Sequence, residues 1–374
     1  MTHQRRPLAV RAFETAARLS NALLAWPNRI VPPPFRLMQI GSAFWQSRVL
    51  YVAATLDLAT ILGDRRLAVA DLAREAEADP AALRRLLRML TAMGVFEETA
   101  PDVFRNNRLS DPLRSDRAGS VRAVVMMHNA PEMSRPWFDH LEQGVRAGAV
   151  PFELAHGQDF YSFLDAHPEF DALFAEAMDQ VEALAGDSFA TAFDWTRFGR
   201  VVDVGGSRGA KSMAILKRHP HLQAVVVDRA QTIEQVRRYW GGRQGPECVS
   251  RMRFEVGDVF SSVPPAVDSR DVYLLSAVLH GFDDEDCARA LRTVVAAAST
   301  AGATIVLLEM VMPDRGADLT ATSFDMQMFM ATKGRERTLA EWRRVCAQGG
   351  VDLVEVVGLP SFGKMLVLRP VADG

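Results

Sequence analysis

Short apolar runs alternate with amphipathic stretches along the second half of the chain. Each run is too short for a helix, is rich in β-branched and aliphatic residues, and is followed by a segment with helical spacing of apolar positions. Such runs are typical of strands buried on both faces of a sheet. They occupy residues 201–204, 222–227, 252–256, 272–275, 303–308, 351–356 and 364–368. We therefore expect an α/β fold with a Rossmann-like, doubly wound, mostly parallel sheet.

The first half of the chain is patterned mainly for helices. One helix is expected from Leu8 to Trp26, stopped by Pro27, and strong helical spacing continues over residues 35–62. Asp79 and Pro80 are a favourable cap and first residue for a further helix. Two short apolar segments around residues 100–102 then predict a hairpin. Helix, turn, helix and hairpin together form a winged-helix arrangement.

Composition and charge narrow the classes of function. The chain has 374 residues and a formal net charge of −3, which argues against a nucleic-acid binder held by phosphate contacts. No apolar run approaches the ~20 residues needed to span a bilayer, so no integral membrane association is expected. The three cysteines are far apart, which suggests a reducing compartment, the cytoplasm, and no structural zinc.

The first strand of the sheet leads into a turn with an unusual glycine pattern. Its spacing, Asp203-x-Gly205-Gly206-x-x-Gly209, fits neither a dinucleotide fingerprint nor a P-loop. Glycines after a strand allow a ligand to approach the backbone closely. An acidic residue followed by this turn resembles the first motif of class I S-adenosylmethionine (SAM) methyltransferases, with Ser207 where a glycine is commoner.

Polar residues end the next two strands at the same sheet edge. Asp228 is placed to accept the hydroxyls of a ribose, although a turn aspartate that caps the following helix is the simpler alternative. Asp258, with Val259 and Phe260, is placed to bracket an adenine by one hydrogen bond and apolar contacts. These residues predict a nucleoside site.

A histidine follows the fourth strand, with two carboxylates at later loops. His280 could remove a proton from a hydroxyl acceptor such as a phenol, whose pKa is about 10. Glu309 and Glu336 are candidates to fix the imidazole tautomer. Asp283 and Asp284 could be proposed as metal ligands, but further ligands with suitable spacing are missing, and we expect no metal.

Taken together, these motifs resemble the plant caffeic-acid-type and bacterial antibiotic-biosynthesis O-methyltransferases, a SAM-dependent small-molecule family. The markers run in order from about Phe35 to Leu368: DVGGSRG, VVDR, GDVF, LSAVLHGFDDEDC, LLEMVMP and GRERTLAEW. The resemblance implies a winged-helix domain used for homodimerisation instead of DNA binding. It also implies that His280 is the general base, flanked by the acidic residues Glu309 and Glu336. The implied cofactor contacts are Asp203, Gly205, Gly206, Asp228, Asp258, Val259 and Phe260.

Three residues, at two places in the chain, depart from the pattern of that family. Its members usually have H-D-W after the strand, whereas this chain has His280-Gly281-Phe282, so a polar side chain beside the base is missing. Ser276 stands where plant members carry a lysine near the cofactor, as bacterial relatives often do.

We expect three segments. Residues 1–115 form an N-terminal helical and winged-helix dimerisation domain, 116–195 are linking helices that contribute to the substrate pocket, and 196–374 are the SAM-binding catalytic domain.

Met178 continues an apolar helical stripe, for which core packing is the ordinary explanation, but soft apolar walls also line pockets for flat ligands. The candidate pocket residues are Met178, Met326, Gln327 and Met330.

The sequence thus predicts a SAM-dependent O-methyltransferase for an aromatic or polyketide-like specialised metabolite. Two alternatives stay open. One is a SAM-binding relative that methylates nitrogen or carbon, or catalyses a hydroxylation or pericyclic step. The other is a winged-helix regulator with a ligand-sensing domain.

Overall fold

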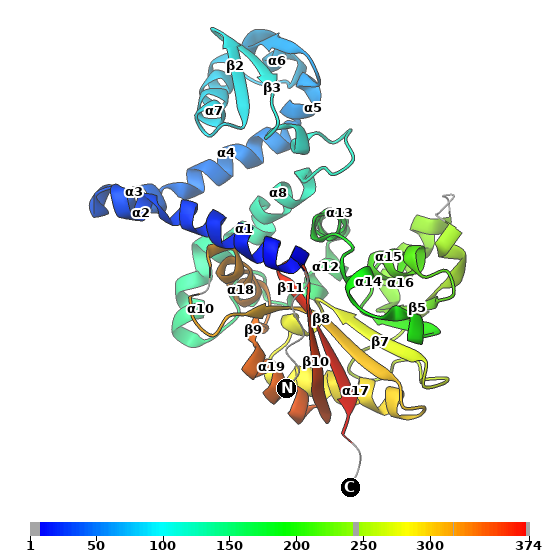
Figure 1. The fold of residues 1–374 in the computed structure, drawn as a ribbon. Helices are drawn as coiled ribbons and strands as arrows, with labels where there is room; N and C mark the ends of the chain where they lie inside the picture. The colour runs from blue at the N-terminus through cyan, green and yellow to red at the C-terminus, as the bar shows by residue number, and fades with distance from the viewer. Residues whose placement is uncertain (1–7, 242–246, 317, 372–374) are drawn as a thin grey trace. The chain divides into compact units, whose positions relative to one another are not determined.

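A computed structural model describes residues 8–241, 247–316 and 318–371. The chain forms two compact units (Figure 1). The sheet unit comprises Met1–Asn21, Gln143–Glu153 and Asp187–Gly374, and the helical unit comprises Ala22–Glu142 and Leu154–Gly186. The division expected at residues 115 and 195 stays a prediction.

The helical unit contains the expected winged helix. A small sheet of order β1-β3-β2 packs with α5, α6 and α7. The strand β1, which the apolar pattern did not predict, pairs antiparallel with β3. The elements are α2 (Pro27–Ile30), α3 (Pro33–Gly41), α4 (Ala43–Thr55), α5 (Leu58–Leu62), β1 (Arg66–Ala68), α6 (Val69–Glu75), α7 (Pro80–Ala92), β2 (Phe96–Ala100), β3 (Val103–Asn106), α8 (Arg122–Asn129), α9 (Pro131–Arg135), α12 (Phe160–Ala166) and α13 (Pro168–Ala185).

The helix α7 at the centre of the winged helix is defined by its N-terminal cap and by one apolar face. The Asp79 side chain accepts the Ala82 N–H, and Pro80 occupies the first turn of α7, as the sequence predicts. Leu83, Leu87 and Leu90 face inwards from α7, where they join a core with both strands of the hairpin.

Prolines begin helices near the N-terminus more often than the sequence suggested. The first helix, α1, spans Leu8–Ala25 and ends before Pro27 as expected. However, Pro27 and Pro33 each occupy the first turn of a new helix, α2 and α3. A proline at that position loses no hydrogen bond, because the first N–H groups of a helix have no partner within it.

The sheet unit contains the doubly wound sheet. Its strand order is β10-β11-β8-β7-β4-β5-β6, and the short β9 pairs with β8 beyond this path. The strands from β8 to β6 are parallel, whereas β11 runs antiparallel to both neighbours. The seven expected strands are all present, as β4 (Arg200–Val204), β5 (Gln223–Asp228), β6 (Met252–Val256), β7 (Asp271–Ser276), β8 (Thr304–Met312), β10 (Val351–Gly358) and β11 (Gly363–Pro370); β9 (Arg337–Thr338) was not predicted.

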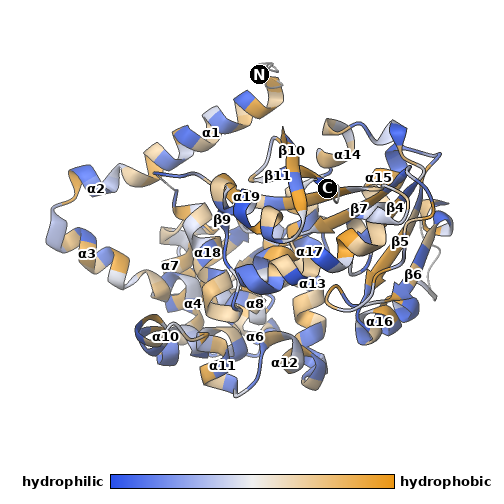
Figure 2. Cartoon of the chain, turned by 90° about the horizontal axis from the view of Figure 1, so that it is seen from below, coloured by the Kyte–Doolittle hydropathy of each residue, from blue (hydrophilic) through white to orange (hydrophobic). Residues whose placement is uncertain are grey.

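Each face of this sheet has its own core. Alternate residues of the strands pack against α17 and α19 on one face, and against α14 and α15 on the other. Figure 2 shows the central strands β4, β5 and β7 in the colours of hydrophobic residues. The helices are α14 (Phe189–Ala192), α15 (Ala210–Arg218), α16 (Ala230–Gly241), α17 (Asp284–Ser299), α18 (Leu319–Ala331) and α19 (Leu339–Gln348). The division of the chain between the two units falls within α10 (Leu141–Ala147) and α11 (Pro151–His156).

Burial on both faces explains the near-continuous apolar strands from which the sheet was predicted. Within the three described ranges, no helix is both long enough and apolar enough to cross a membrane.

Candidate active site

The turn after β4 is built for close approach to the backbone. Gly205 and Gly209 have φ of 73° and 78°, and Ser207 is held at 48°. A Cβ on Gly205 would lie 2.7 Å from Val278 Cγ2, and one on Gly206 would lie 2.6 Å from Asp203 Cγ. Space therefore requires glycine at both 205 and 206, and at 205 the positive φ favours glycine as well.

Asp203 lies underneath this turn. Its side chain is buried and accepts a hydrogen bond of 2.7 Å from the hydroxyl of Ser212 on α15. The acidic residue of the motif therefore ties the end of β4 to the helix that follows it. The structure places Asp203 as a support of the turn, and its predicted cofactor contact stays a prediction.

Asp228 ends β5 beside the same turn. Its Oδ2 accepts the Ser207 N–H at 2.9 Å, and its Oδ1 accepts the Arg229 N–H at 2.8 Å. The carboxylate thus links the ends of two adjacent parallel strands. Each carboxylate oxygen can accept more than one hydrogen bond, so both retain capacity for ligand hydroxyls.

The segment after β6 forms a compact turn. Asp258 Oδ1 accepts the Phe260 N–H at 2.9 Å, which fixes the path of residues 258–260. The Phe260 and Phe282 rings meet edge to face with their centroids 4.8 Å apart, and the Arg289 guanidinium lies 4.4 Å from the Phe260 centroid. Val259 packs against the core. Phe282, at the position where the resemblance leads one to expect tryptophan, therefore supports the predicted adenine wall.

His280 lies on a short 3₁₀ turn, Leu279–Gly281, beyond the end of β7. Its Nδ1 donates to Glu336 Oε1 at 2.8 Å, and its side chain is 22% exposed, whereas that of Glu336 is almost fully buried. The carboxylate fixes the tautomer that carries hydrogen on Nδ1, so Nε2 is the atom that can accept a proton. The structure therefore brings together the predicted histidine and one predicted carboxylate.

Glu309, on β8, is placed differently from the sequence-based expectation that it orients the imidazole. Its Oε1 accepts the N–H groups of Val278 and Leu279 at 3.1 and 3.0 Å, so it holds the backbone from which His280 projects. The other oxygen, Oε2, is buried with no hydrogen-bond partner in the described part of the chain, and the same is true of Glu336 Oε2.

The two carboxylates change the proton affinity of the site. Burial lowers the pKa of His280, but the hydrogen bond to Glu336 and the charges of Glu309 and Glu336 outweigh it and raise that pKa to about 9. Burial raises the pKa of Glu309 to about 7, against the opposing effect of the His280 charge. Near neutral pH the site therefore contains an imidazolium paired with Glu336, and a Glu309 carboxyl that is partly protonated.

The remaining predicted residues are less closely grouped. Ser276 ends β7 and is half-buried. Met326 and Gln327 are half-buried on α18, and Met330 on the same helix is completely buried. Met178 lies on α13 in the helical unit, whereas the others lie in the sheet unit. A pocket shared by these residues stays a prediction.

Asp283 and Asp284, considered above as metal ligands, have other partners. Asp283 caps α17 by accepting the Asp286 N–H, and Asp284 forms ion pairs with Arg335 and Arg337. Among the described residues, no group of three or more His, Cys, Asp or Glu side chains is arranged to hold a metal ion.

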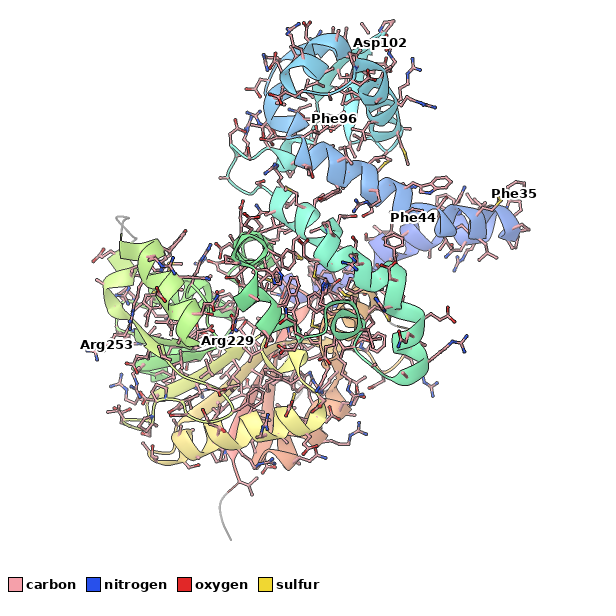
Figure 3. The ribbon with its side chains drawn as sticks, turned by 180° about the vertical axis from the view of Figure 1, so that it is seen from behind. Phe35, Phe44, Phe96, Asp102, Arg229 and Arg253 are labelled. Carbon is pink, nitrogen blue, oxygen red and sulfur yellow. The ribbon has the colours of Figure 1, made fainter. Side chains whose placement is uncertain are left out.

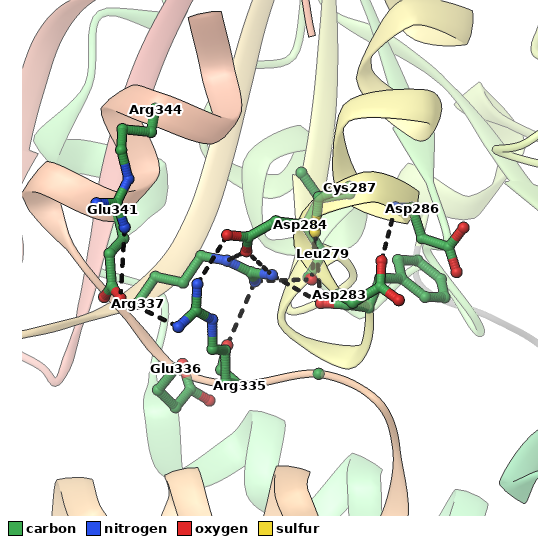
Figure 4. A network of polar contacts seen from close by, with 12 residues as sticks. Leu279, Asp283, Asp284, Asp286, Cys287, Arg335, Glu336, Arg337, Glu341 and Arg344 are labelled. Atoms are coloured by element: carbon green, nitrogen blue, oxygen red, sulfur yellow. Dashed lines mark hydrogen bonds and ion pairs between the residues drawn. The ribbon is translucent and has the colours of Figure 1, made fainter. Parts of the chain in front are cut away.

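Sequence reasoning missed two residues that contact the turn at 279–282, Gly334 and Arg337. A Cβ on Gly334 would collide with the carbonyl oxygen of His280, so the segment before β9 packs directly on this turn. The buried Arg337 binds the turn from the same segment (Figure 4). The string GRERT contains both residues, but its letters carry no sign of contacts that span more than fifty positions in the chain.

Two family models match the chain. An O-methyltransferase domain matches residues 138–352, and an O-methyltransferase dimerisation domain matches residues 38–116. The first covers more than half of the chain, and together they span the helical and α/β parts expected from the sequence.

Curated relatives and solved structures agree with these matches. The phenazine O-methyltransferase PhzM of Lysobacter antibioticus is 30% identical over 91% of this chain and 97% of its own length. The 8-amino-8-demethylriboflavin N,N-dimethyltransferase of Streptomyces davaonensis is 31% identical over 86% and 91%. The crystal structure of the O-methyltransferase NcsB1 from neocarzinostatin biosynthesis, in complex with SAM and 2-hydroxy-5-methyl naphthoic acid, aligns with a TM-score of 0.74 and 28% identity over 87% of this chain and 96% of that chain. The expected methyltransferase fold is confirmed.

Proposed function

Because the chain belongs to the O-methyltransferase family, we propose that it methylates a hydroxyl group of an aromatic or polyketide-like specialised metabolite, with SAM as donor and His280 as general base. The observation that carries this proposal is the pair of His280 and Glu336 at the ligand edge of the sheet, where Glu309 holds the same turn.

The residues at the ends of β4, β5 and β6 fit a nucleoside such as that of SAM. The turn at Gly205 and Gly206 leaves no room for side chains, Asp228 offers a carboxylate at the next strand end, and Phe260 offers an aromatic ring beside Asp258. When bound, SAM would supply an electrophilic methyl group on a sulfonium sulfur. The backbone turn and Asp228 would bind the donor, while Phe260 and Val259 would exclude water from its base.

His280 would perform the proton transfer. A phenolic hydroxyl has a pKa near 10 and becomes a strong nucleophile only as its proton leaves. The Nε2 atom of neutral His280 accepts that proton, and Glu336 on Nδ1 stabilises the imidazolium that results. Glu309 keeps the base in place through the backbone N–H groups of Val278 and Leu279.

Relatives support an aromatic acceptor. The matched NcsB1 structure contains a naphthoic acid, and the Lysobacter relative is named for phenazine. In this chain we assign contacts with the acceptor to the half-buried side chains of α18, with Met326 as an apolar wall and Gln327 as a polar contact. Thioether side chains adapt to flat rings of different outline.

The proposal is tested by mass spectrometry of products formed with methyl-labelled SAM and a panel of phenolic polyketides and aromatic acids. We expect wild type to yield methylated products, and His280→Ala to lose about 10²- to 10⁴-fold in rate while retaining SAM binding. His221→Ala is the matched control, because His221 is exposed just before β5, at the opposite edge of the sheet, and should keep full activity. Equal rates in His280→Ala and wild type would remove His280 from the mechanism.

N-methylation is the second candidate function. The riboflavin-related relative at 31% identity is named as an N,N-dimethyltransferase, so the family framework serves amine acceptors as well. Aromatic amines in the same panel, with fragmentation spectra that locate the added methyl group on nitrogen or oxygen, separate the two. Methyl transfer to amines alone would replace the hydroxyl proposal.

We also assign this chain a homodimer formed through the helical unit. The family model for dimerisation matches residues 38–116, and the helices around its start expose large apolar side chains, among them Phe35 and Phe44, which Figure 3 labels. The exposed set is Leu23, Leu24, Trp26, Ile30, Phe35, Leu37, Met38, Ile40, Phe44 and Trp45. Water contact with so much apolar surface is unfavourable, and a second copy would remove it.

DNA is a poorer partner for the winged helix. In a winged helix that binds DNA, α7 would enter the major groove, but its Arg84 and Arg88 pair with Asp102 in the hairpin at 2.8 and 4.0 Å.

Sedimentation at micromolar protein tests the dimer directly. We expect Met38→Glu, at a side chain 69% exposed, to convert a dimer into a monomer, whereas Val267→Glu, at 74% exposure in the sheet unit, should leave it unchanged. A wild-type monomer would contradict the assignment.

The cysteines fit a reducing compartment, which supports a location in the cytoplasm. Cys248, Cys287 and Cys346 are all buried and form no disulfides.

A further inference from the structure

Arg337 is a completely buried cation next to the catalytic turn. Its Nε and Nη2 contact Asp284 Oδ1 at 2.9 and 2.8 Å. Its Nη2 also donates to the carbonyl oxygen of Phe282 at 2.8 Å, and its Nη1 donates to that of Leu279 at 3.3 Å. Figure 4 shows the guanidinium lying between Asp284 and the backbone at Leu279. The planar, five-donor group of arginine is suited to such a set of acceptors.

These contacts bracket the base. Leu279 and Phe282 lie on either side of His280 and Gly281 in the chain, so Arg337 holds both ends of the turn that carries the imidazole. The residue before it in sequence, Glu336, accepts the hydrogen bond from that imidazole. Two consecutive residues, Glu336 and Arg337, therefore contact the ring of His280 and the backbone on both sides of it.

The same segment makes a third contact with the turn. The absent side chain of Gly334 allows the backbone there to lie against the carbonyl of His280. The Trp342 ring, 5.1 Å from the Arg337 guanidinium, and the Asp284 carboxylate, shared with Arg335, complete the surroundings of the cation. Movement of Arg337 would thus change the distance between His280 and Glu336.

A buried arginine can also be purely structural, and the chain contains such a residue for comparison. Arg114 in the helical unit is 6% exposed and pairs with Asp64 and Asp116 at 2.8 and 2.9 Å. Its partners are carboxylates, while Arg337 binds two carbonyl groups that flank the base. Arg114 therefore serves as a control for a buried arginine that has no contact with the turn that carries His280.

We propose that Arg337 is a positioning residue for methyl transfer: it fixes the turn at 279–282 against the segment that carries Glu336, and so keeps the His280 ring in the orientation that leaves Nε2 as the proton acceptor. The role in proton transfer rests on the proposed function, whereas the effect on the histidine ring does not.

The kinetic test compares Arg337→Lys with Arg114→Lys, each of which retains the charge and removes the fork of donors. We expect Arg337→Lys to lower kcat about 10- to 100-fold with SAM affinity unchanged, because misplacement of a base by about 1 Å has effects of this size. In the His280→Ala background, Arg337→Lys should change the residual rate less than about twofold, since the residue acts through the histidine. Arg114→Lys should leave kcat unaltered in both backgrounds.

A second measurement does not depend on activity. Charged and titratable groups contact the turn and its neighbours from four elements: Glu309 on β8, residues 335–337 at β9, Asp325 on α18, and Asp283, Asp284 and Cys287 at the start of α17. Nuclear magnetic resonance of the His280 imidazole should show its titration midpoint falling by about one pH unit in Arg337→Lys, because the ring loses the Glu336 carboxylate. In Arg114→Lys it should stay at the wild-type value.

The outcomes separate the two proposals. An inactive wild type would reject the proposed function, while the imidazole titration would still decide the role of Arg337. An unchanged titration and an unchanged kcat in Arg337→Lys would overturn the positioning role, as would equal losses in the Arg337 and Arg114 variants. Asp284→Asn, at a half-exposed carboxylate, should move both readouts in the same direction as Arg337→Lys and serves if that variant fails to fold.

Discussion

Two adjacent turns at one edge of the sheet are built by opposite means. The turn at 205–209, beyond β4, holds Gly205, Ser207 and Gly209 in left-handed backbone conformations and has no space for a Cβ on Gly205 or Gly206. The turn at 279–282, beyond the neighbouring β7, is surrounded by buried ionisable groups. The first can select a ligand by shape and by backbone approach. The second sets the charge state of one histidine. Changes at the first should therefore alter cofactor affinity, and changes at the second should alter the rate and its pH dependence.

The pH dependence offers the largest effect with which to test this contrast. His280 must be neutral to accept a proton, and its pKa is raised to about 9. The neutral fraction is then only about 1% at pH 7 and increases about tenfold per pH unit below the midpoint. We expect kcat/KM for the acceptor, measured at saturating SAM, to rise about 50-fold between pH 7 and pH 9, where half of His280 is neutral, while SAM affinity stays nearly constant. Initial rates and calorimetry across this range measure both.

Ionisation of the acceptor hydroxyl could produce a similar rise, and Glu336→Gln distinguishes the two causes. The amide oxygen can still accept the Nδ1 hydrogen bond, but the negative charge that raises the pKa of His280 is gone. The midpoint should move to lower pH by about one pH unit or more if the histidine controls it. A midpoint that stays in place would assign the pH dependence to the acceptor and contradict the role of His280.

The same contrast explains what the sequence could predict. The strands and the glycine turn depend on local pattern, so the seven expected strands and the spacing from Asp203 to Gly209 correspond to what the structure shows. Local pattern correctly placed the end of the first helix before Pro27 but did not show that Pro27 begins another, since a proline can end one helix and begin the next.

The turn at 279–282 depends on contacts between distant parts of the chain. The sequence indicated that His280, Glu309 and Glu336 belong together, but not which group each carboxylate contacts. Glu336 accepts a hydrogen bond from the His280 ring, whereas Glu309 accepts those of the backbone N–H groups of Val278 and Leu279. Arg337 could not be recognised at all, because a buried arginine and an exposed one have the same letter. Its significance comes only from the two carbonyl groups that it reaches.

A substitution in the glycine turn should have a smaller effect, confined to the cofactor. A Cβ at residue 206 would lie 2.6 to 2.9 Å from the carboxylate of Asp203, which is buried and short, so the turn must shift. Overpacking of this kind costs about 1–3 kcal/mol, and we expect Gly206→Ala to weaken SAM binding about 10-fold or more. The pH midpoint of kcat at saturating SAM should not move, because the surroundings of His280 are unaltered.

Gly199→Ala is the control for this substitution. Gly199 precedes β4 at the opposite edge of the sheet, and a Cβ there would lie 3.6 Å from the nearest atom of Arg270, an ordinary contact. It should leave SAM affinity within about twofold of wild type, as expected for a substitution away from strained or packed positions. If calorimetry gave equal SAM affinities for Gly206→Ala and Gly199→Ala, the turn would not be selecting its ligand by shape. A displaced pH midpoint in Gly206→Ala would show that the two turns are coupled, because strain at residue 206 would then reach His280 through Val278, whose side chain lies against Gly205.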